Sequence, residues 1–149
     1  MQITRSADYA LRVMIHLAAL PAGARPSREI IAQWTEVPSE FLSKVLQALT
    51  RARLIQSHRG ATGGFALARP GDEITALDVL QAIEGPLQLN LCLSDDPLCG
   101  RRWWCAGHQL WRDAQAALAG VLQSSTIAQL ARDSFRDKVY TQIEAPRWN

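Results

Sequence analysis

The chain has 149 residues, a length that suits one ordinary domain or a small domain with an added helical arm and leaves little room for two full domains. The net charge is only +2, but residues 1–70 hold nine Lys or Arg against four acids and residues 71–149 hold seven against ten, a basic first half that weakly indicates nucleic acid. No secretory leader opens the chain and no stretch is apolar over the length of a membrane span, so we expect a cytoplasmic protein without a membrane partner.

Three helices are predicted first along the chain. An apolar repeat of three to four residues predicts an amphipathic helix over about residues 6–20. Ser27 is placed to cap a second helix, and Pro38 with Ser39 opens a third. The second and third helices, joined by the sequence TEVPS, form a helix-turn-helix pattern. This pattern predicts that the third helix enters the major groove of DNA.

A β-hairpin is predicted directly after the third helix. Leu54 and Ile55 precede a glycine-rich turn, and alternating apolar residues resume at Phe65. Three helices followed by a hairpin with Arg59 at its base predict a winged helix, whose wing touches phosphates or the minor groove. The glycines of this turn permit positive φ and let it pass close to a sugar-phosphate backbone; they are Gly60, Gly63 and Gly64.

A fourth helix is predicted to close the winged-helix domain. Thr75 and Asp78 have the spacing of a capping box, and Gly85 is placed to end the helix that they begin.

A long helix over about residues 108–123 lies outside this predicted domain. Its apolar residues fall on one face, and a twofold partner is the commonest cover for such a face in a protein that reads DNA half-sites, so we expect a homodimer. A short helix capped by Thr126 and Gln129 is expected next. The fold class is therefore mainly α, divided into a winged-helix DNA-binding domain (1–85), a cysteine loop (86–107), a dimerisation helix with a short terminal helix (108–140) and a tail (141–149).

All three cysteines of the chain, Cys92, Cys99 and Cys105, lie within fourteen residues, and His108 follows. Thiolates and imidazole select zinc, copper or an iron-sulfur cluster. The intervening gaps of six, five and two residues lack the tight cysteine spacing of a zinc finger, and a wide loop wraps a cluster more easily than a single ion. The spacing favours an iron-sulfur cluster and leaves zinc and unligated, redox-active thiols open.

The order of these features resembles the IscR/NsrR-type winged-helix transcription regulators of bacteria, the Rrf-two superfamily. The resemblance covers about residues 1–133 and rests on DYALR, on FLSKVLQAL in the third helix, on RGATGGFAL in the wing and on the cysteine triplet before HQLW. It implies a homodimer that binds a pseudopalindromic operator in double-stranded DNA and acts as a repressor. It also implies control by an iron-sulfur cluster that senses redox state, nitric oxide or iron status. We expect no enzyme activity, because the sequence contains no nucleophile-base pair or phosphate loop.

The resemblance also implies a set of cluster ligands. Cys92, Cys99 and Cys105 match the family's three thiolates. Cys105-x-x-His108 resembles the iron-sulfur biogenesis regulator, in which histidine is the fourth ligand of a [2Fe-2S] cluster, although the first gap here is one residue longer. At Asp8 the chain resembles the nitric-oxide-sensing branch of the family, in which a carboxylate of the partner subunit completes a [4Fe-4S] cluster. We favour [2Fe-2S] and keep a zinc-stabilised or cluster-free, thiol-responsive DNA-binding protein as the alternative.

DNA contacts are expected from the first turns of the third helix and from the cations around it. Lys44 is the expected phosphate or guanine contact of the helix, and Arg59 is the expected phosphate contact of the wing. Glu40 and Ser43 differ from the biogenesis regulator, so its operator sequence is not expected here. The predicted DNA-binding residues are Arg28, Ser39, Glu40, Ser43, Lys44, Arg51, His58, Arg59 and Gly60.

Overall fold

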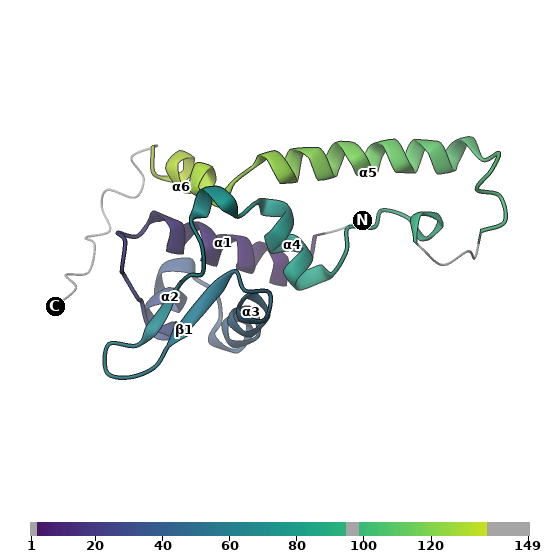
Figure 1. Cartoon of the computed structure of the whole chain (residues 1–149). Helices are drawn as coiled ribbons and strands as arrows, with labels where there is room; N and C mark the ends of the chain where they lie inside the picture. Colours follow the sequence, from purple (N-terminus) through teal and green to yellow (C-terminus); the bar gives the residue numbers. More distant parts are fainter. Residues whose placement is uncertain (1–2, 95–98, 137–149) are drawn as a thin grey trace.

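A computed structural model describes residues 3–94 and 99–136 of the chain, and the following statements concern those residues (Figure 1). A helical body carries a two-stranded hairpin, and one long helix extends away from it (Figure 1). The fold is mainly helical with one antiparallel hairpin, which confirms the predicted winged helix. Its elements are α1 (Arg5–Ala19), α2 (Arg28–Thr35), α3 (Ser39–Arg51), β1 (Ile55–His58), β2 (Gly64–Leu67), η1 (Gly71–Glu73), α4 (Ala76–Glu84), η2 (Leu91–Leu93), α5 (Ala106–Ser124) and α6 (Ile127–Arg136).

The helix caps predicted from the sequence are present. The Ser27 hydroxyl accepts a hydrogen bond from the Ile30 amide at 3.4 Å and begins α2. The Thr75 hydroxyl accepts the Asp78 amide at 3.1 Å, while the Asp78 carboxylate accepts the Thr75 amide at 3.0 Å, which completes the capping box of α4. Gly85 ends α4 with a φ of 80°, a conformation that glycine adopts without strain. The predicted caps are therefore confirmed, and the observed helix bounds lie within two residues of the predicted ones.

The helix-turn-helix unit is held against α1 by one apolar face of α3. Val37 in the connecting turn is buried, and Glu36 adopts the left-handed conformation, with a φ of 55°, where α2 ends. The buried face of α3 consists of Leu42, Val45, Leu46 and Leu49. Because these residues recur every three to four positions, the opposite face of the same helix points to solvent.

The wing pairs Ile55 with Leu67 and His58 with Gly64. Arg59 therefore begins the turn at the tip of the hairpin, and the prediction that it lies at the base was wrong, because the strands continue to residue 58. Of the three turn glycines, Gly60 has positive φ, at 105°. Gly63 is required for a different reason, since a Cβ there would lie 2.4 Å from the His58 carbonyl oxygen.

Gly64 holds the wing to the segment before α2. The Phe65 amide donates a hydrogen bond to the Pro26 carbonyl at 3.0 Å, and a Cβ on Gly64 would lie 2.2 Å from the Arg25 oxygen and 2.5 Å from the Pro26 oxygen. The Gly64→Ala substitution must push these backbones apart, so we expect the free energy of unfolding to fall by about 1–3 kcal/mol. Denaturant titration of the two proteins measures the difference.

Gly120→Ala is the matched control for this prediction. Gly120 lies within α5, and a Cβ there meets no atom within 4 Å. Alanine in a helix interior is favoured over glycine by about 0.5–1 kcal/mol, so the control is expected to keep or raise the stability. Equal destabilisation by both substitutions would show that the wing does not depend on its contact with Pro26.

The terminal helix α6 packs into the core of the winged helix. Ile127 is fully buried and Ala131 is nearly so, and α6 lies against α1. Two backbone hydrogen bonds fix its start: the Ala76 amide donates to the Ser125 carbonyl at 2.8 Å, and the Ile127 amide donates to the Ile74 carbonyl at 2.9 Å. The sequence-based division grouped this segment with the dimerisation helix; in the structure it packs against α1 of the predicted DNA-binding domain. The predicted segment with the short terminal helix reaches residue 140. Residues 137–149, which include its last residues and the predicted tail, lie outside the described residues.

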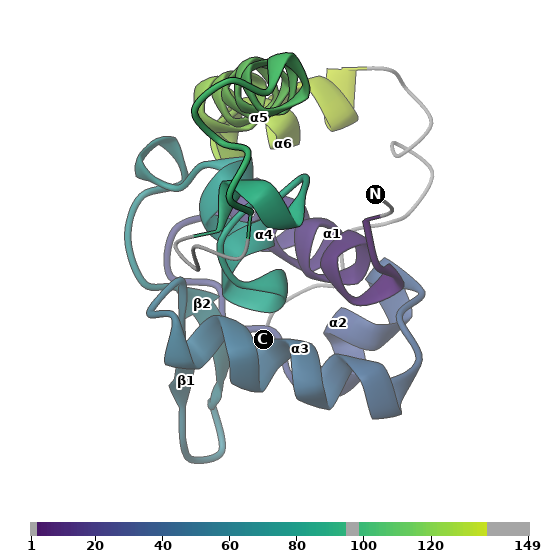
Figure 2. The same cartoon turned by 90° about the vertical axis from the view of Figure 1, so that its right-hand side faces the viewer.

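The long helix α5 contributes no buried residue to the described chain. It contacts α4 and η2 and runs along the side of the body opposite to α3 and the wing (Figures 1 and 2). Its apolar side chains remain accessible, with Leu110 61%, Trp111 41% and Val121 64% exposed. Among the described residues, no helix combines the length and apolar character needed to cross a membrane.

Candidate DNA-binding surface and cysteine loop

The solvent face of α3 is the candidate surface for reading DNA. Recognition helices of this fold present the face opposite to the core to the major groove. On α3 this face carries side chains at successive spacings of four, three and four residues, all of them exposed: Glu40, Lys44, Gln47 and Arg51. The predicted contacts Glu40, Lys44 and Arg51 therefore lie on one stripe, and Ser39 is exposed at the start of the helix.

Ser43 lies beside this stripe, and its hydroxyl is already engaged. It donates a hydrogen bond to the Ser39 carbonyl at 3.1 Å and accepts one from Nη1 of Arg28 at 3.1 Å. Nη2 of Arg28 also pairs with Glu29 at 3.4 Å. The structure thus brings the predicted residues Arg28 and Ser43 together and holds the guanidinium group over the side of α3.

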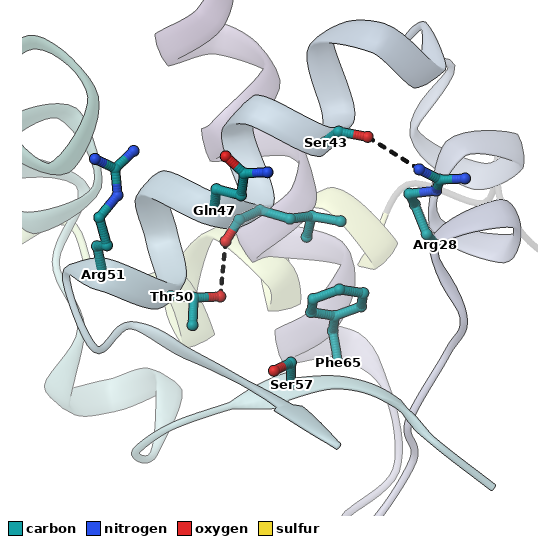
Figure 3. Close-up of a pocket in the computed structure, with 8 residues that line it drawn as sticks. Arg28, Ser43, Gln47, Thr50, Arg51, Ser57 and Phe65 are labelled. Atoms are coloured by element: carbon teal, nitrogen blue, oxygen red, sulfur yellow. Dashed lines mark hydrogen bonds between the residues drawn. The ribbon is translucent and has the colours of Figure 1, made fainter. Parts of the chain in front are cut away.

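A cleft of about 530 Å³ separates α3 from the wing (Figure 3). Arg28 lies at one end of the cleft and Arg51 at the other, with the exposed residues of α3 between them (Figure 3). The Thr50 hydroxyl donates to the Leu46 carbonyl at 2.7 Å and so faces its own helix. The lining residues are Arg28, Ser43, Leu46, Gln47, Thr50, Arg51, Ser57 and Phe65. A cleft with a cation at each end suits an anionic backbone.

Five lining residues were not predicted from the sequence as part of the DNA-binding site: Leu46, Gln47, Thr50, Ser57 and Phe65. Gln47 follows Lys44 by three residues, so helical spacing alone could have placed it on the stripe. Ser57 and Phe65 reach the cleft only through the hairpin register, in which they are paired. The remaining predicted wing residues lie at its tip, where His58 is half-buried and Arg59 and Gly60 are exposed.

The cysteine loop lies at the far end of α5. Cys92 belongs to η2, which contacts α5, and Cys105 is the N-cap residue of α5 (Figure 1). Cys99 precedes that helix, and all three thiols are free and half-buried. His108 follows in the first turn of α5, where its amide donates to the Cys105 carbonyl at 3.0 Å.

Among the described residues, the structure does not gather three of these donors into one group. In residues 3–94 and 99–136, no three Cys, His, Asp or Glu side chains form a group that could hold one metal ion. Part of the loop between Cys92 and Cys99, residues 95–98, lies outside the described residues. Nδ1 of His108 is nevertheless buried without a hydrogen-bond partner among the described residues, a state that is costly for an imidazole nitrogen.

Asp8, the alternative ligand, is placed differently. It lies in the first turn of α1, and its carboxylate pairs with Nη2 of Arg12 at 2.8 Å. The guanidinium of Arg12 also lies 5.8 Å from the centre of the Tyr9 ring. Asp8 therefore has a partner within its own helix, whereas the His108 Nδ1 atom has none among the described residues. Three free thiols and this nitrogen form a donor set that fits an iron-sulfur cluster or zinc.

Comparisons with known proteins place the chain in a family. Residues 3–133 match the Rrf2 (Rrf-two) family, described as an iron-dependent transcriptional regulator. The HTH-type transcriptional regulator CymR of Bacillus subtilis is 33% identical over 88% of this chain and 90% of its own length, and Protein rrf2 of Nitratidesulfovibrio vulgaris is 30% identical over 90% and 89%.

Solved structures agree with this assignment. The structure of B. subtilis CymR, described as the global cysteine regulator, matches with a TM-score of 0.75 and 30% identity over 89% of this chain and 98% of that one. IscR of T. potens has the same fold, with a TM-score of 0.73 and 24% identity over 90% of this chain and 88% of that one. The chain belongs to the Rrf2 family of winged-helix transcriptional regulators and is not an enzyme.

Proposed function

We propose that this regulator is a homodimeric repressor whose operator binding is controlled by an iron-sulfur cluster held by Cys92, Cys99, Cys105 and His108. The proposal rests on three free, half-buried thiols in the loop before α5 and on the buried Nδ1 atom of His108, in the first turn of that helix, which has no partner among the described residues. The family description as iron-dependent supports it. Free thiols also suit the reducing cytoplasm, where we place the protein. A bound cluster supplies a group that oxidants or nitric oxide alter or remove.

The path from the loop to the DNA-binding surface runs through α5. Cys105 is the N-cap residue of this helix and Ser125 its C-cap residue; the helix packs on α4, and the Ser125 carbonyl accepts a hydrogen bond from the Ala76 amide. A change in the cysteine loop that displaces the first turn of α5 would therefore alter how α5 packs on the winged-helix body. In a dimer the two recognition helices must lie about 34 Å apart, one turn of DNA, so a modest rotation weakens binding.

His108 is the fourth ligand in this proposal. Its Nδ1 atom is buried and lacks a partner among the described residues, whereas Asp8 is paired with Arg12 at 2.8 Å. Wild type, His108→Ala and Asp8→Ala should be purified without oxygen and compared by visible absorption, iron content and acid-labile sulfide. We expect His108→Ala to shift the spectrum and to lower cluster retention several-fold, because replacement of a ligand leaves the cluster open to exchange. Asp8→Ala is expected to match wild type.

The opposite pattern would identify Asp8 as the ligand, with cluster loss in Asp8→Ala and a normal spectrum in His108→Ala. Zinc without sulfide in the wild type would contradict the cluster and support a structural metal site. The same purification therefore tests both the nature of the metal centre and its ligands.

A second function is favoured by one comparison. Staphylococcus aureus CymR, 32% identical over 88% of this chain, has a solved structure described as its oxidized form. This likeness supports direct oxidation of free thiols as the alternative signal, without a cluster. A colourless, iron-free protein from anaerobic purification whose operator binding changes on thiol oxidation would establish this alternative.

A further inference from the structure

Gln47 occupies the middle of the exposed stripe on α3. It lies opposite the buried residues of the same helix and lines the cleft beside the wing. Within the described part of the chain, its side-chain amide makes no hydrogen bond (Figure 3). Both the amide N–H donors and the carbonyl acceptor are therefore available to a ligand.

The neighbouring hydroxyl groups of α3 in the cleft are engaged by the protein. The Ser43 hydroxyl bonds Ser39 and Arg28, both at 3.1 Å, and the Thr50 hydroxyl bonds Leu46 at 2.7 Å. Each hydroxyl would have to break its bond to a backbone carbonyl before it could donate a hydrogen bond to a base. Gln47 has no such bond to break, so it is the neutral polar side chain of α3 in the cleft that is best placed to contact a base.

Cations border Gln47 along the cleft. Figure 3 shows Arg28 at one end of the cleft and Arg51 at the other, with Gln47 between them. Lys44 is exposed on the same stripe, three residues earlier. Cations of this kind bind phosphates and set the register of the protein on the duplex, and a side chain between them then faces the base edges.

We propose that Gln47 is a specificity-determining residue that reads an adenine in the major groove. The glutamine amide matches adenine in both directions, donating to N7 and accepting from the N6 amino group, a pairing that no other base edge offers in that pattern. The inference rests on DNA binding by this family member and is independent of the iron-sulfur proposal.

Selection from randomised DNA duplexes tests the proposal. Full-length wild type, purified without oxygen, defines the preferred sequence, and Gln47→Ala and Gln47→Glu are then measured against single-base variants of it. Gln47→Ala is expected to lose about tenfold to a hundredfold of preference at one A·T pair in each half-site. Its salt dependence should not change, because glutamine carries no charge. Gln47→Glu is expected to shift preference at that pair toward cytosine, whose amino group donates to a carboxylate.

Gln123→Ala is the matched control, since Gln123 is an exposed glutamine on α5, on the side of the body opposite to α3 (Figure 1). It should leave every base preference unchanged. Unaltered preference in both Gln47 variants, with wild type still selecting a defined sequence, would overturn this inference and leave the family function intact. Absence of any selected sequence for wild type would count instead against operator binding itself and against this inference with it.

Discussion

Cys99→Ala is expected to remove the visible absorbance of the anaerobically purified protein and to weaken operator binding about 5- to 150-fold, the usual range of coupling between two sites. Cys99 is the central thiol of the loop, flanked in sequence by Cys92 and Cys105. Its loss leaves too few thiolates for the cluster, because the remaining donors are two thiols and one imidazole nitrogen. Absorption spectra and binding to a labelled operator duplex measure the two effects on the same sample.

The control for this prediction is Gln109→Ala. Gln109 lies in the first turns of α5, is exposed, and donates its side-chain hydrogen bond to Asp113 at 2.7 Å. The substitution alters the start of the helix without removing a ligand, so colour and operator affinity should match wild type. If the Cys99→Ala protein keeps the visible absorbance and the operator affinity of wild type, the proposed ligand set is wrong.

Val121→Asp is expected to convert the proposed dimer to a monomer and to weaken operator binding by more than about a hundredfold. Val121 is 64% exposed and lies on α5, which buries none of its residues in the described chain. A second copy that covers this face would bury the new carboxylate without a partner, which is strongly unfavourable. A monomer binds only one half-site. It loses the gain in affinity, about 10²- to 10⁴-fold, that arises when two DNA-binding domains are linked.

Gln123→Asp provides the matched control, because two residues along a helix turn the side chain by about 200°, away from the apolar face. The two variants carry the same charge and differ only in the face that bears it. Sedimentation and operator binding should distinguish them, with Gln123→Asp behaving as wild type. If Val121→Asp stays dimeric, the apolar face of α5 is not the interface between copies.

The fold could be predicted because local rules decided its elements. Ser27, Thr75, Asp78 and Gly85 carry cap chemistry that acts over three or four residues, and each one was placed correctly. The apolar spacing of α3 likewise fixed its buried face and therefore the side that points to solvent. Such features need no knowledge of distant parts of the chain.

Other features could not be predicted from the sequence, because they depend on contacts between residues that are far apart in the chain. The docking of α6 on the core requires Ile127 to meet Ile74, more than fifty residues earlier. The position of Arg59 at the tip of the wing depended on the register of the hairpin. At the candidate site, Ser43 has the right residue type to contact DNA, but only the structure reveals that its hydroxyl holds Arg28.

The cysteine loop shows the same division. Residue types and clustering predict the donors Cys92, Cys99, Cys105 and His108 without a structure. Our proposal of His108 over Asp8 rests on their surroundings, since one has a buried nitrogen without a described partner and the other a salt bridge. Sequence could not distinguish them because both are single residues near the start of a helix.

Operator affinity measured on one anaerobic preparation in three states tests the central claim most directly. The protein is assayed as purified, after removal of iron with a chelator, and after reconstitution with iron and sulfide. We expect the affinity to fall on removal and to return on reconstitution, in proportion to the cluster absorbance, by about 5- to 150-fold. Equal affinity in all three states would contradict control by an iron-sulfur cluster.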